Sequence, residues 1–383
     1  MKRSVDRILT THVGSIVRPP ELLELASYQK GPPKDPVLYA KRLADAIVTV
    51  VRQQAEAGID IINDGEFGKT SWANYVLDRI SGFEPSSEKQ PFHWLGRDLE
   101  RFPEVMEVEF PGIKDGQQTY CCTGPITYTR TGDIRHEIES FKKALSQVKV
   151  EEGFITVVAP ASAVYSGFNQ HYANERDYIF ALAEALRQEY LEVHEAGLVV
   201  QVDDAVLANM YDYLVQQSPQ HYRKWAELRI EALNHALRDI PEDRVRYHVC
   251  FGSWHVPHIS DAPLEDIVDL ILQVKAGAYS LEAANPRHEH EWRVWEKTKL
   301  PKDKILIPGV ITHHIITVEH PQVVADRIVR FANIVGRENV IAGTDCGFAQ
   351  VEFIQRVHPK VMWAKFEALA EGARLATKEL WGR

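Results

Sequence analysis

The chain has 383 residues, of which 45% are hydrophobic and 26% charged, and its formal net charge at pH 7 is −10. This composition is typical of a globular protein with a sizeable core, and the acidic balance argues against a nucleic-acid partner. No apolar run approaches the roughly 18–20 residues that cross a membrane. The sequence has only four cysteines, far from the density of a disulfide scaffold, so we expect a reducing, cytoplasmic compartment.

Four times along the chain, a helical stretch ends in a glycine and leads into a short apolar run. The units read AKRLADAIVTVVRQQAEAG–IDIINDGE, NERDYIFALAEALRQEYLEVHEAG–LVVQVDDA, LEDIVDLILQVKAG–AYSLEAANP and HPQVVADRIVRFANIVG–RENVIAGTDCG. A glycine suits the left-handed end of a helix, and the apolar runs suit strands buried on both faces of a parallel sheet. This repetition favours an α/β fold, a (β/α)8 TIM barrel with long inserted βα loops, over a doubly wound sheet.

More strands are predicted than such a barrel holds. The candidates lie near residues 8–15, 59–66, 119–127, 154–162, 198–204, 247–253, 278–284, 305–311 and 339–346. One of these nine is therefore misassigned or lies outside the barrel. Residues 84–118 resemble an inserted arm, and one barrel domain over residues 1–383 accounts for the length.

Polar and metal-binding side chains follow several of these strands. They are Ser15, Arg18, Asp64, Glu66, Asp203, Asp204, His248, Cys250, Glu282, His313, His314, Asp345 and Cys346. Active sites of TIM barrels lie at the carboxyl ends of the strands, so we expect these residues to surround one site.

The spacing of His248 and Cys250 raises the possibility of a metal site. Residues two apart in a strand point the same way, so both side chains can reach one ion, with Cys346 and Glu282 joining from neighbouring strands. Two thiolates and an imidazole favour tetrahedral Zn²⁺, and three firm ligands with a displaceable fourth indicate a catalytic site. Taken alone, the pair is a weak signal, and a buried thiol beside a satisfied histidine explains it better. Cys346 in GTDCGF and Glu282 in SLEAANP strengthen the metal interpretation.

Seven segments, in this order, resemble the catalytic barrel of cobalamin-independent methionine synthase and the single-barrel members of that family. They are TTHVGSIVRPPEL, AGIDIINDGEFGKTSWANYV, AGLVVQVDDAVLA, YHVCFGSWH, YSLEAANPR, IPGVITHH and AGTDCGF. The resemblance implies a zinc-dependent methyltransferase that converts homocysteine to methionine. Its zinc ligands would be His248, Cys250, Glu282 and Cys346.

The resemblance also implies roles for residues around the metal. Glu66 and Asp203 match carboxylates that hold the amino-acid end of homocysteine, and Ser15 matches a loop that contacts the same substrate through its backbone. His314 matches a histidine near the methyl donor that acts as a proton donor, although His313 is an equally close candidate by sequence. Asp203 and His314 are thus the candidate catalytic residues.

The partners left open are the thiol and the alkyl donor. The larger enzymes carry a second barrel and a tryptophan for the pterin, whereas the corresponding segment here reads VAPASAVYSGF. A folate, a methylcorrinoid or an epoxide therefore stays possible as donor. Two carboxylates favour homocysteine, which carries an amine. The alternative thiol is coenzyme M, whose sulfonate would require arginines such as Arg18 or Arg130. Arg18 is therefore also among the substrate-binding candidates.

Two other classes of protein remain as alternatives. One is a zinc-bearing binding or storage protein without turnover. The other is a lyase barrel related to uroporphyrinogen decarboxylase, which would not need the His248, Cys250 and Cys346 set. His12 fits a structural histidine as well as a pocket residue, and HEHEW at 288–292 is expected on a charged, solvated loop.

Overall fold

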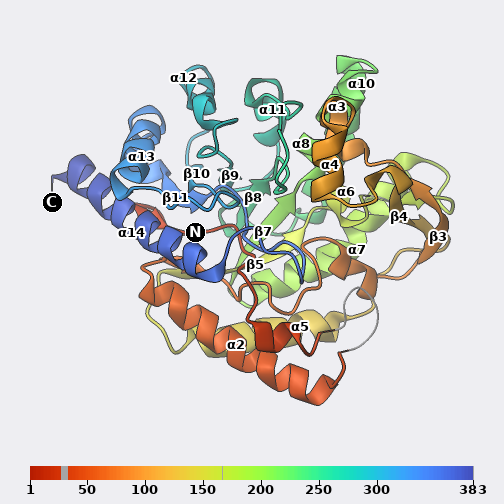
Figure 1. The fold of residues 1–383 in the computed structure, drawn as a ribbon, viewed down its shortest axis with the longest axis horizontal. Helices are drawn as coiled ribbons and strands as arrows, with labels where there is room; N and C mark the ends of the chain where they lie inside the picture. The colour runs from red at the N-terminus through yellow and green to blue at the C-terminus, as the bar shows by residue number, and fades with distance from the viewer. Residues whose placement is uncertain (27–32, 166, 383) are drawn as a thin grey trace.

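A barrel of parallel strands forms the centre of the computed structural model, which describes residues 1–26, 33–165 and 167–382 (Figure 1). The strands are β1 (Leu9–Thr10), β2 (Ile61–Ile62), β5 (Glu152–Val158), β7 (Val199–Asp204), β8 (Val245–Val249), β9 (Ala278–Leu281), β10 (Ile305–Ile311) and β11 (Ile341–Thr344). Each pairs in parallel with its neighbours in chain order, β11 pairs with β1, and a bridge between Thr11 and Ile61 joins β1 to β2. The predicted TIM barrel is confirmed.

Helices follow the strands and cover the outside of the barrel (Figure 1). The longer ones are α2 (Pro36–Glu56), α5 (Thr131–Leu145), α7 (Glu175–Glu195), α10 (Pro219–Ala236), α11 (Leu264–Ile271), α13 (Pro321–Val335) and α14 (Pro359–Trp381). Short ones are α1 (Pro20–Leu23), α6 (Pro160–Ala163), α8 (Val206–Asn209), α9 (Tyr211–Val215) and α12 (Val294–Lys297). Among the helices of the described ranges, none is both long and apolar enough to cross a membrane.

The barrel interior changes from apolar to polar along the strands. Leu9, Ile61, Phe154, Val199, Ala278, Ile305, Ile307 and Ile341 form an apolar cluster. Two positions beyond Val199 and Ala278, the buried side chains are those of Gln201 and Ser280, and Gln201 is in register with Arg246. Because side chains two apart share a face, the next level brings Asp203 beside its register partner His248. Polar groups thus collect at the carboxyl ends of the strands.

The ninth predicted strand, residues 119–127, lies outside the barrel. It corresponds to β4 (Gln117–Cys122), which pairs antiparallel with β3 (Phe83–Gln90) and parallel with β6 (Phe168–Asn169). Between β3 and β4 run η2 (His93–Leu95), α3 (Gly96–Arg101), α4 (Pro103–Glu109) and η3 (Ile113–Asp115), which pack around Leu95, Met106 and Ile113. Because β4 pairs with β3 and β6, it belongs to a separate three-stranded sheet and not to the barrel.

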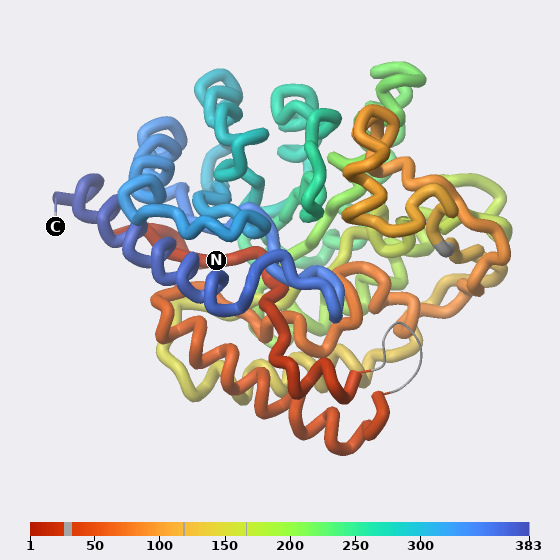
Figure 2. Tube along the Cα trace, in the orientation of Figure 1, coloured from red at the N-terminus to blue at the C-terminus, as the bar shows by residue number. Residues whose placement is uncertain are grey.

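The segment from β3 to β4, which we call the arm, lies across the carboxyl ends of several barrel strands (Figure 2). Arg97 Nε donates to Asp212, in α9 beyond β7, at 2.8 Å. Glu109 Oε1 accepts from the backbone N–H of His255, beyond β8, at 3.0 Å and from Arg356 Nη1, beyond β11, at 2.9 Å. The arm therefore connects loops at the end of the barrel where the polar side chains collect.

A buried ion triad joins η1 (Asn74–Asp78) to the helices α5 and α7. Arg79 follows η1 and donates to Glu137 at 2.8 Å and to Glu189 at 2.7 Å, and all three side chains are at most 8% exposed. Removing one partner of a buried ion pair leaves a charge without compensation. The triad therefore fixes how these elements pack.

We expect Arg79→Met to lower the free energy of unfolding by about 3–5 kcal/mol, because Glu189 loses its cation and Glu137 keeps only its longer pair with Lys69. Urea denaturation measures the change. Arg374→Met is the control, since its pair with Glu371 is exposed and is worth at most about 1 kcal/mol. Equal, small losses in both variants would contradict the assigned role of Arg79.

Candidate metal and substrate site

Three of the predicted ligands converge at the end of β8 and β11. His248 lies in β8, Cys250 follows that strand directly, and Cys346 follows β11. Their ligand atoms all lie within 4.8 Å of one another, and the two Sγ atoms are 3.6 Å apart. His248 Nδ1 faces Ser280 Oγ at 3.3 Å, which leaves Nε2 buried and without a hydrogen-bond partner among the described residues.

This cluster fits a zinc ion. Two sulfur atoms bound tetrahedrally at about 2.3 Å from Zn²⁺ lie roughly 3.8 Å apart, whereas a disulfide requires about 2.05 Å. The buried Nε2 of His248 would regain a partner on binding metal, and an unpaired buried nitrogen is costly. The neighbouring Cys250 thiol and His248 imidazole hold the pKa of Cys346 well below its usual range. The donor set of two sulfurs and one imidazole suits zinc.

Glu282, the fourth predicted ligand, lies in an adjoining cluster. Its carboxylate is grouped with His313 and Asp345, within 4.8 Å of one another. Oε1 accepts from the backbone N–H of Phe251 at 3.1 Å, and Oε2 accepts from Asn285 Nδ2 at 2.8 Å. The structure therefore brings three predicted ligands together and holds the fourth beside them by hydrogen bonds.

Two buried carboxylates adjoin the cluster of predicted ligands. Asp203 is the register partner of His248 and accepts from Gln201 Nε2 at 2.7 Å. Burial raises the pKa of Asp203 to about 8, and the negative charge of Glu66 contributes to that increase. Burial likewise raises the pKa of Glu66. Such a pair of desolvated acids favours a cationic group between them.

The loop that carries Glu66 is held in a strained conformation against the HVGS turn. Glu66 has a backbone φ of +61°, which residues other than glycine rarely adopt. The exceptions cluster at functional sites. A Cβ on Gly14 would collide with Glu66 Oε1, so only glycine allows this close approach. Ser15 accepts from the backbone N–H of Phe348 at 2.8 Å through its carbonyl. Ser15 and Glu66 thus adjoin through Gly14.

Lys69 belongs to this side of the site, although the sequence analysis did not single it out. Its ammonium is buried, donates to Thr156 Oγ1 at 2.8 Å and pairs with Glu137 at 3.7 Å. The positive charge beside Glu66 opposes the effect of burial on the pKa of that carboxyl. A lysine in a polar loop segment such as GEFGKTSW is normally solvated, so its burial gives no signal in the sequence.

The arginines considered for anion binding are engaged elsewhere. Arg18 is buried and donates to three backbone carbonyls of neighbouring loops at 2.7–3.0 Å, including that of Glu66. Arg130 pairs with Asp133 at 3.1 Å near the surface. Arg356, which the sequence did not indicate, instead reaches the arm through Glu109.

The two adjacent histidines after β10 have different surroundings. His313 is fully buried, and neither ring nitrogen has a partner among the described residues. His314 is partly exposed, and its ring centroid lies 5.8 Å from that of His255 and 6.3 Å from that of His258. Burial lowers the pKa of His314 to about 4. His314 is the more accessible candidate for proton transfer.

Residues 8–365 match the family described as "Cobalamin-independent synthase, Catalytic domain". The chain belongs to this family. The resemblance found in the sequence is thereby confirmed.

Similar proteins include "Methionine synthase" of Saccharolobus islandicus, 23% identical over 97% of this chain and 95% of the relative. "Methionine synthase" of Sulfolobus acidocaldarius is 24% identical over 99% and 95%. The B12-independent methionine synthase of Shewanella sp. W3-18-1, solved with selenomethionine, shares the fold with a TM-score of 0.73, at 18% identity over 98% and 100% of the two chains. A putative B12-independent methionine synthase from Listeria monocytogenes has a TM-score of 0.65, at 19% identity over 98% and 100%.

His12 has the contacts of a structural histidine. Nε2 lies 2.7 Å from Gln54 Oε1, and the ring packs against Phe154 and Phe366 at centroid distances of 5.5 and 5.4 Å. Burial lowers the pKa of His12 to about 3. Folding therefore keeps this imidazole neutral in mild acid.

Because the unfolded chain protonates His12 with a pKa of about 6.5, acid should favour unfolding through this residue. Stability from neutral His12 is present above pH 6.5 and is lost as the pH falls towards 3. Between pH 6.5 and 4.5 the wild type should lose about 2–3 kcal/mol more than His12→Gln. Urea denaturation across this range tests it, and parallel pH profiles would refute the assignment.

Proposed function

We propose that this protein is a zinc-dependent thiol methyltransferase that methylates homocysteine to methionine. The convergence of His248, Cys250 and Cys346 beside the buried acids Glu66 and Asp203 carries the proposal. The family and the similar methionine synthases support it. The complex of the Shewanella enzyme with selenomethionine, an analogue of the expected product, also supports it. A reducing cytoplasm would keep both cysteines available as ligands.

The metal would be held by His248, Cys250 and Cys346, with Glu282 as the exchangeable fourth ligand. A bound zinc ion supplies the acidity that turns a substrate thiol, with a pKa of about 8.5, into a nucleophilic thiolate at neutral pH. The hydrogen bond between His248 Nδ1 and Ser280 fixes which ring nitrogen is free to bind the metal.

The substrate would be oriented by the acidic side of the site. Glu66 and Asp203 would bind the ammonium of homocysteine, which would in turn favour their charged forms. The turn at Gly14 and Ser15 would hold the remaining amino-acid end through its backbone. Attack would form the bond from sulfur to the methyl carbon and break the bond from methyl to donor. His314, whose imidazole is neutral at pH 7, would relay to the departing group the proton that the substrate thiol gives up.

The alternative in which coenzyme M is the thiol, with an epoxide or a methylcorrinoid as donor, has less support. Its sulfonate needs a cation where the site has two carboxylates, and its thiol carries no amine to pair with them. Arg18 and Arg130 both have other partners. The proposal therefore retains homocysteine and leaves the methyl donor among folates and corrinoids.

A thermal-shift series on the zinc-loaded protein tests the choice of thiol. Homocysteine at 100 times its dissociation constant should stabilise the native state by about 2.7 kcal/mol, and coenzyme M should not. The stabilisation should be lost in Glu66→Gln and Asp203→Asn, because the ammonium loses its charged partners. Glu371→Gln, which changes an exposed carboxylate, is the matched control.

Two outcomes would contradict this part of the proposal. Stabilisation by coenzyme M that persists in both carboxylate variants would transfer the assignment to that thiol. The absence of any response to thiols would favour a binding or storage protein.

A further inference from the structure

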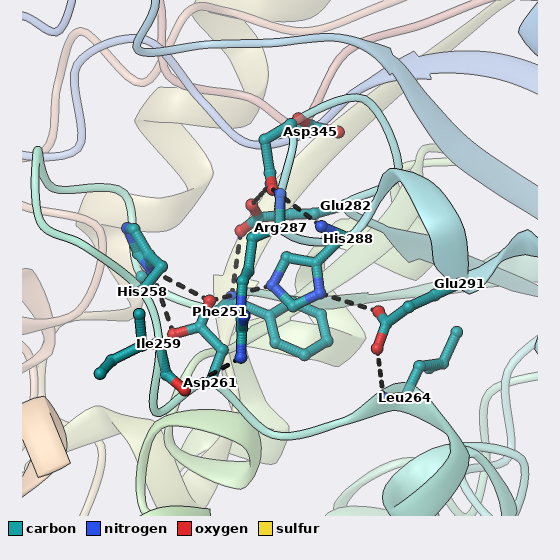
Figure 3. A network of polar contacts seen from close by, with 12 residues as sticks. Phe251, His258, Ile259, Asp261, Leu264, Glu282, Arg287, His288, Glu291 and Asp345 are labelled. Atoms are coloured by element: carbon teal, nitrogen blue, oxygen red, sulfur yellow. Dashed lines mark hydrogen bonds and ion pairs between the residues drawn. The ribbon is translucent and has the colours of Figure 1, made fainter. Parts of the chain in front are cut away.

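A network of four ionisable side chains joins the loops that follow β8 and β9 (Figure 3). His288 Nδ1 lies 2.8 Å from Glu291, and its Nε2 lies 2.9 Å from Asp261. Both carboxylate oxygens of Asp261 also lie 3.0 Å from His258 Nδ1. His288 and Glu291 are buried, and only 12% and 11% of the side chains of His258 and Asp261 are exposed. The expectation that HEHEW lies on a solvated loop is therefore wrong for His288 and Glu291.

The contacts favour the cationic form of both histidines. Each ring nitrogen of His288 faces a carboxylate, and an ionised carboxylate only accepts, so the doubly protonated ring satisfies both contacts. The same holds for His258, whose Nε2 lies 3.0 Å from the carbonyl oxygen of Trp254. The carboxylates of Asp261 and Glu291 raise the pKa of His288 to about 10 against the opposing effect of burial. Two buried cations thus neutralise two buried anions.

Two short paths lead from this network to predicted metal ligands. The His288 ring lies 4.2 Å, centroid to centroid, from that of Phe251, the neighbour of Cys250 in the chain. The backbone N–H of His288 donates to Asn285 Oδ1 at 3.1 Å, and Asn285 Nδ2 donates to Glu282 at 2.8 Å. The two paths meet at Glu282, because the backbone N–H of Phe251 also donates to its carboxylate, at 3.1 Å.

The loop after β8 is held by side-chain contacts, with the arm at His255 and with the network at His258 and Asp261. From residue 250 to 263 the chain contains neither helix nor strand, so side chains must fix its course. Within it His258 has a φ of +56°, a strained conformation for a residue with a side chain. Glu291 anchors the far end by accepting from the backbone N–H of Leu264, the first residue of α11, at 2.8 Å.

We propose that His258, Asp261, His288 and Glu291 form a positioning network that sets the affinity of the site for its metal by holding Cys250 and Glu282 in place. Burying four ions is a costly way to stabilise a loop, since apolar packing of similar volume is often as stable or more so. Fixed hydrogen-bond geometry, which apolar side chains cannot supply, is what a metal site requires of its surroundings. This inference rests on the proposed zinc function.

Zinc affinity, measured by competition with a chromophoric chelator, tests the network. Asp261→Asn and His288→Gln should bind Zn²⁺ about 10–100-fold more weakly than the wild type, whereas Asp261→Glu should recover part of the loss. His235→Gln is the matched control, because His235 also lies 2.9 Å from a carboxylate, that of Glu184, but at the surface. It lies in the last turn of α10, before the start of β8, whereas the site lies at the carboxyl end of β8. Its affinity should equal that of the wild type.

Thermal unfolding of the zinc-free variants separates positioning from mere stability. A lowered melting temperature with unchanged zinc affinity in both variants would overturn the inference. Cobalt substitution adds a spectroscopic check: at saturating Co²⁺ the network variants should keep the thiolate charge-transfer band, and Cys250→Ser should reduce it. If the wild type binds no zinc, the proposed function fails instead, so the two failures are distinguishable.

Discussion

The approach of two sulfur atoms to within 3.6 Å is the constraint on which the rest of the site depends. Cys250 and Cys346 follow β8 and β11, which are separated in the sheet by β9 and β10. In a flat sheet, strands three places apart lie roughly 14 Å from each other. Closure of the barrel and inward-pointing side chains bring the thiols together. The proposed metal site therefore depends on the closure of the barrel.

The site concentrates costly groups that folding alone would not select. Asp203 and Glu66 are buried with raised pKa values, and Glu66 has a strained backbone. Buried cations lie near them, with Lys69 beside Glu66 and Arg246 stacked on Phe154 at 4.2 Å. Outside the site, the apolar cluster inside the barrel supplies stability, and the Arg79 triad fixes how η1, α5 and α7 pack. Costly buried charges thus lie at the site and stabilising contacts lie away from it. This arrangement fits an enzyme whose bound ligand neutralises part of the buried charge.

The sequence predicted the barrel because the unit of helix, glycine and apolar run recurs along the chain, and each unit can be recognised from neighbouring residues alone. It also indicated Cys250 and Cys346, whose residue types are rare in this chain and follow strands. The strand 119–127 was ambiguous because an apolar run has the same pattern in the barrel as in the small outer sheet. Lys69 and His288 could not be recognised, since charged residues in loops are usually solvated and burial depends on long-range packing. The separation of Glu282 from the thiol cluster likewise depends on Asn285 and a backbone N–H.

The central claim is that the substrate sulfur joins the two cysteine sulfurs on one metal ion. X-ray absorption at the zinc edge, with and without homocysteine, measures this directly. We expect two sulfur neighbours at about 2.3 Å in the free protein and three when homocysteine is bound. An unchanged number of sulfur neighbours at saturating homocysteine would contradict it.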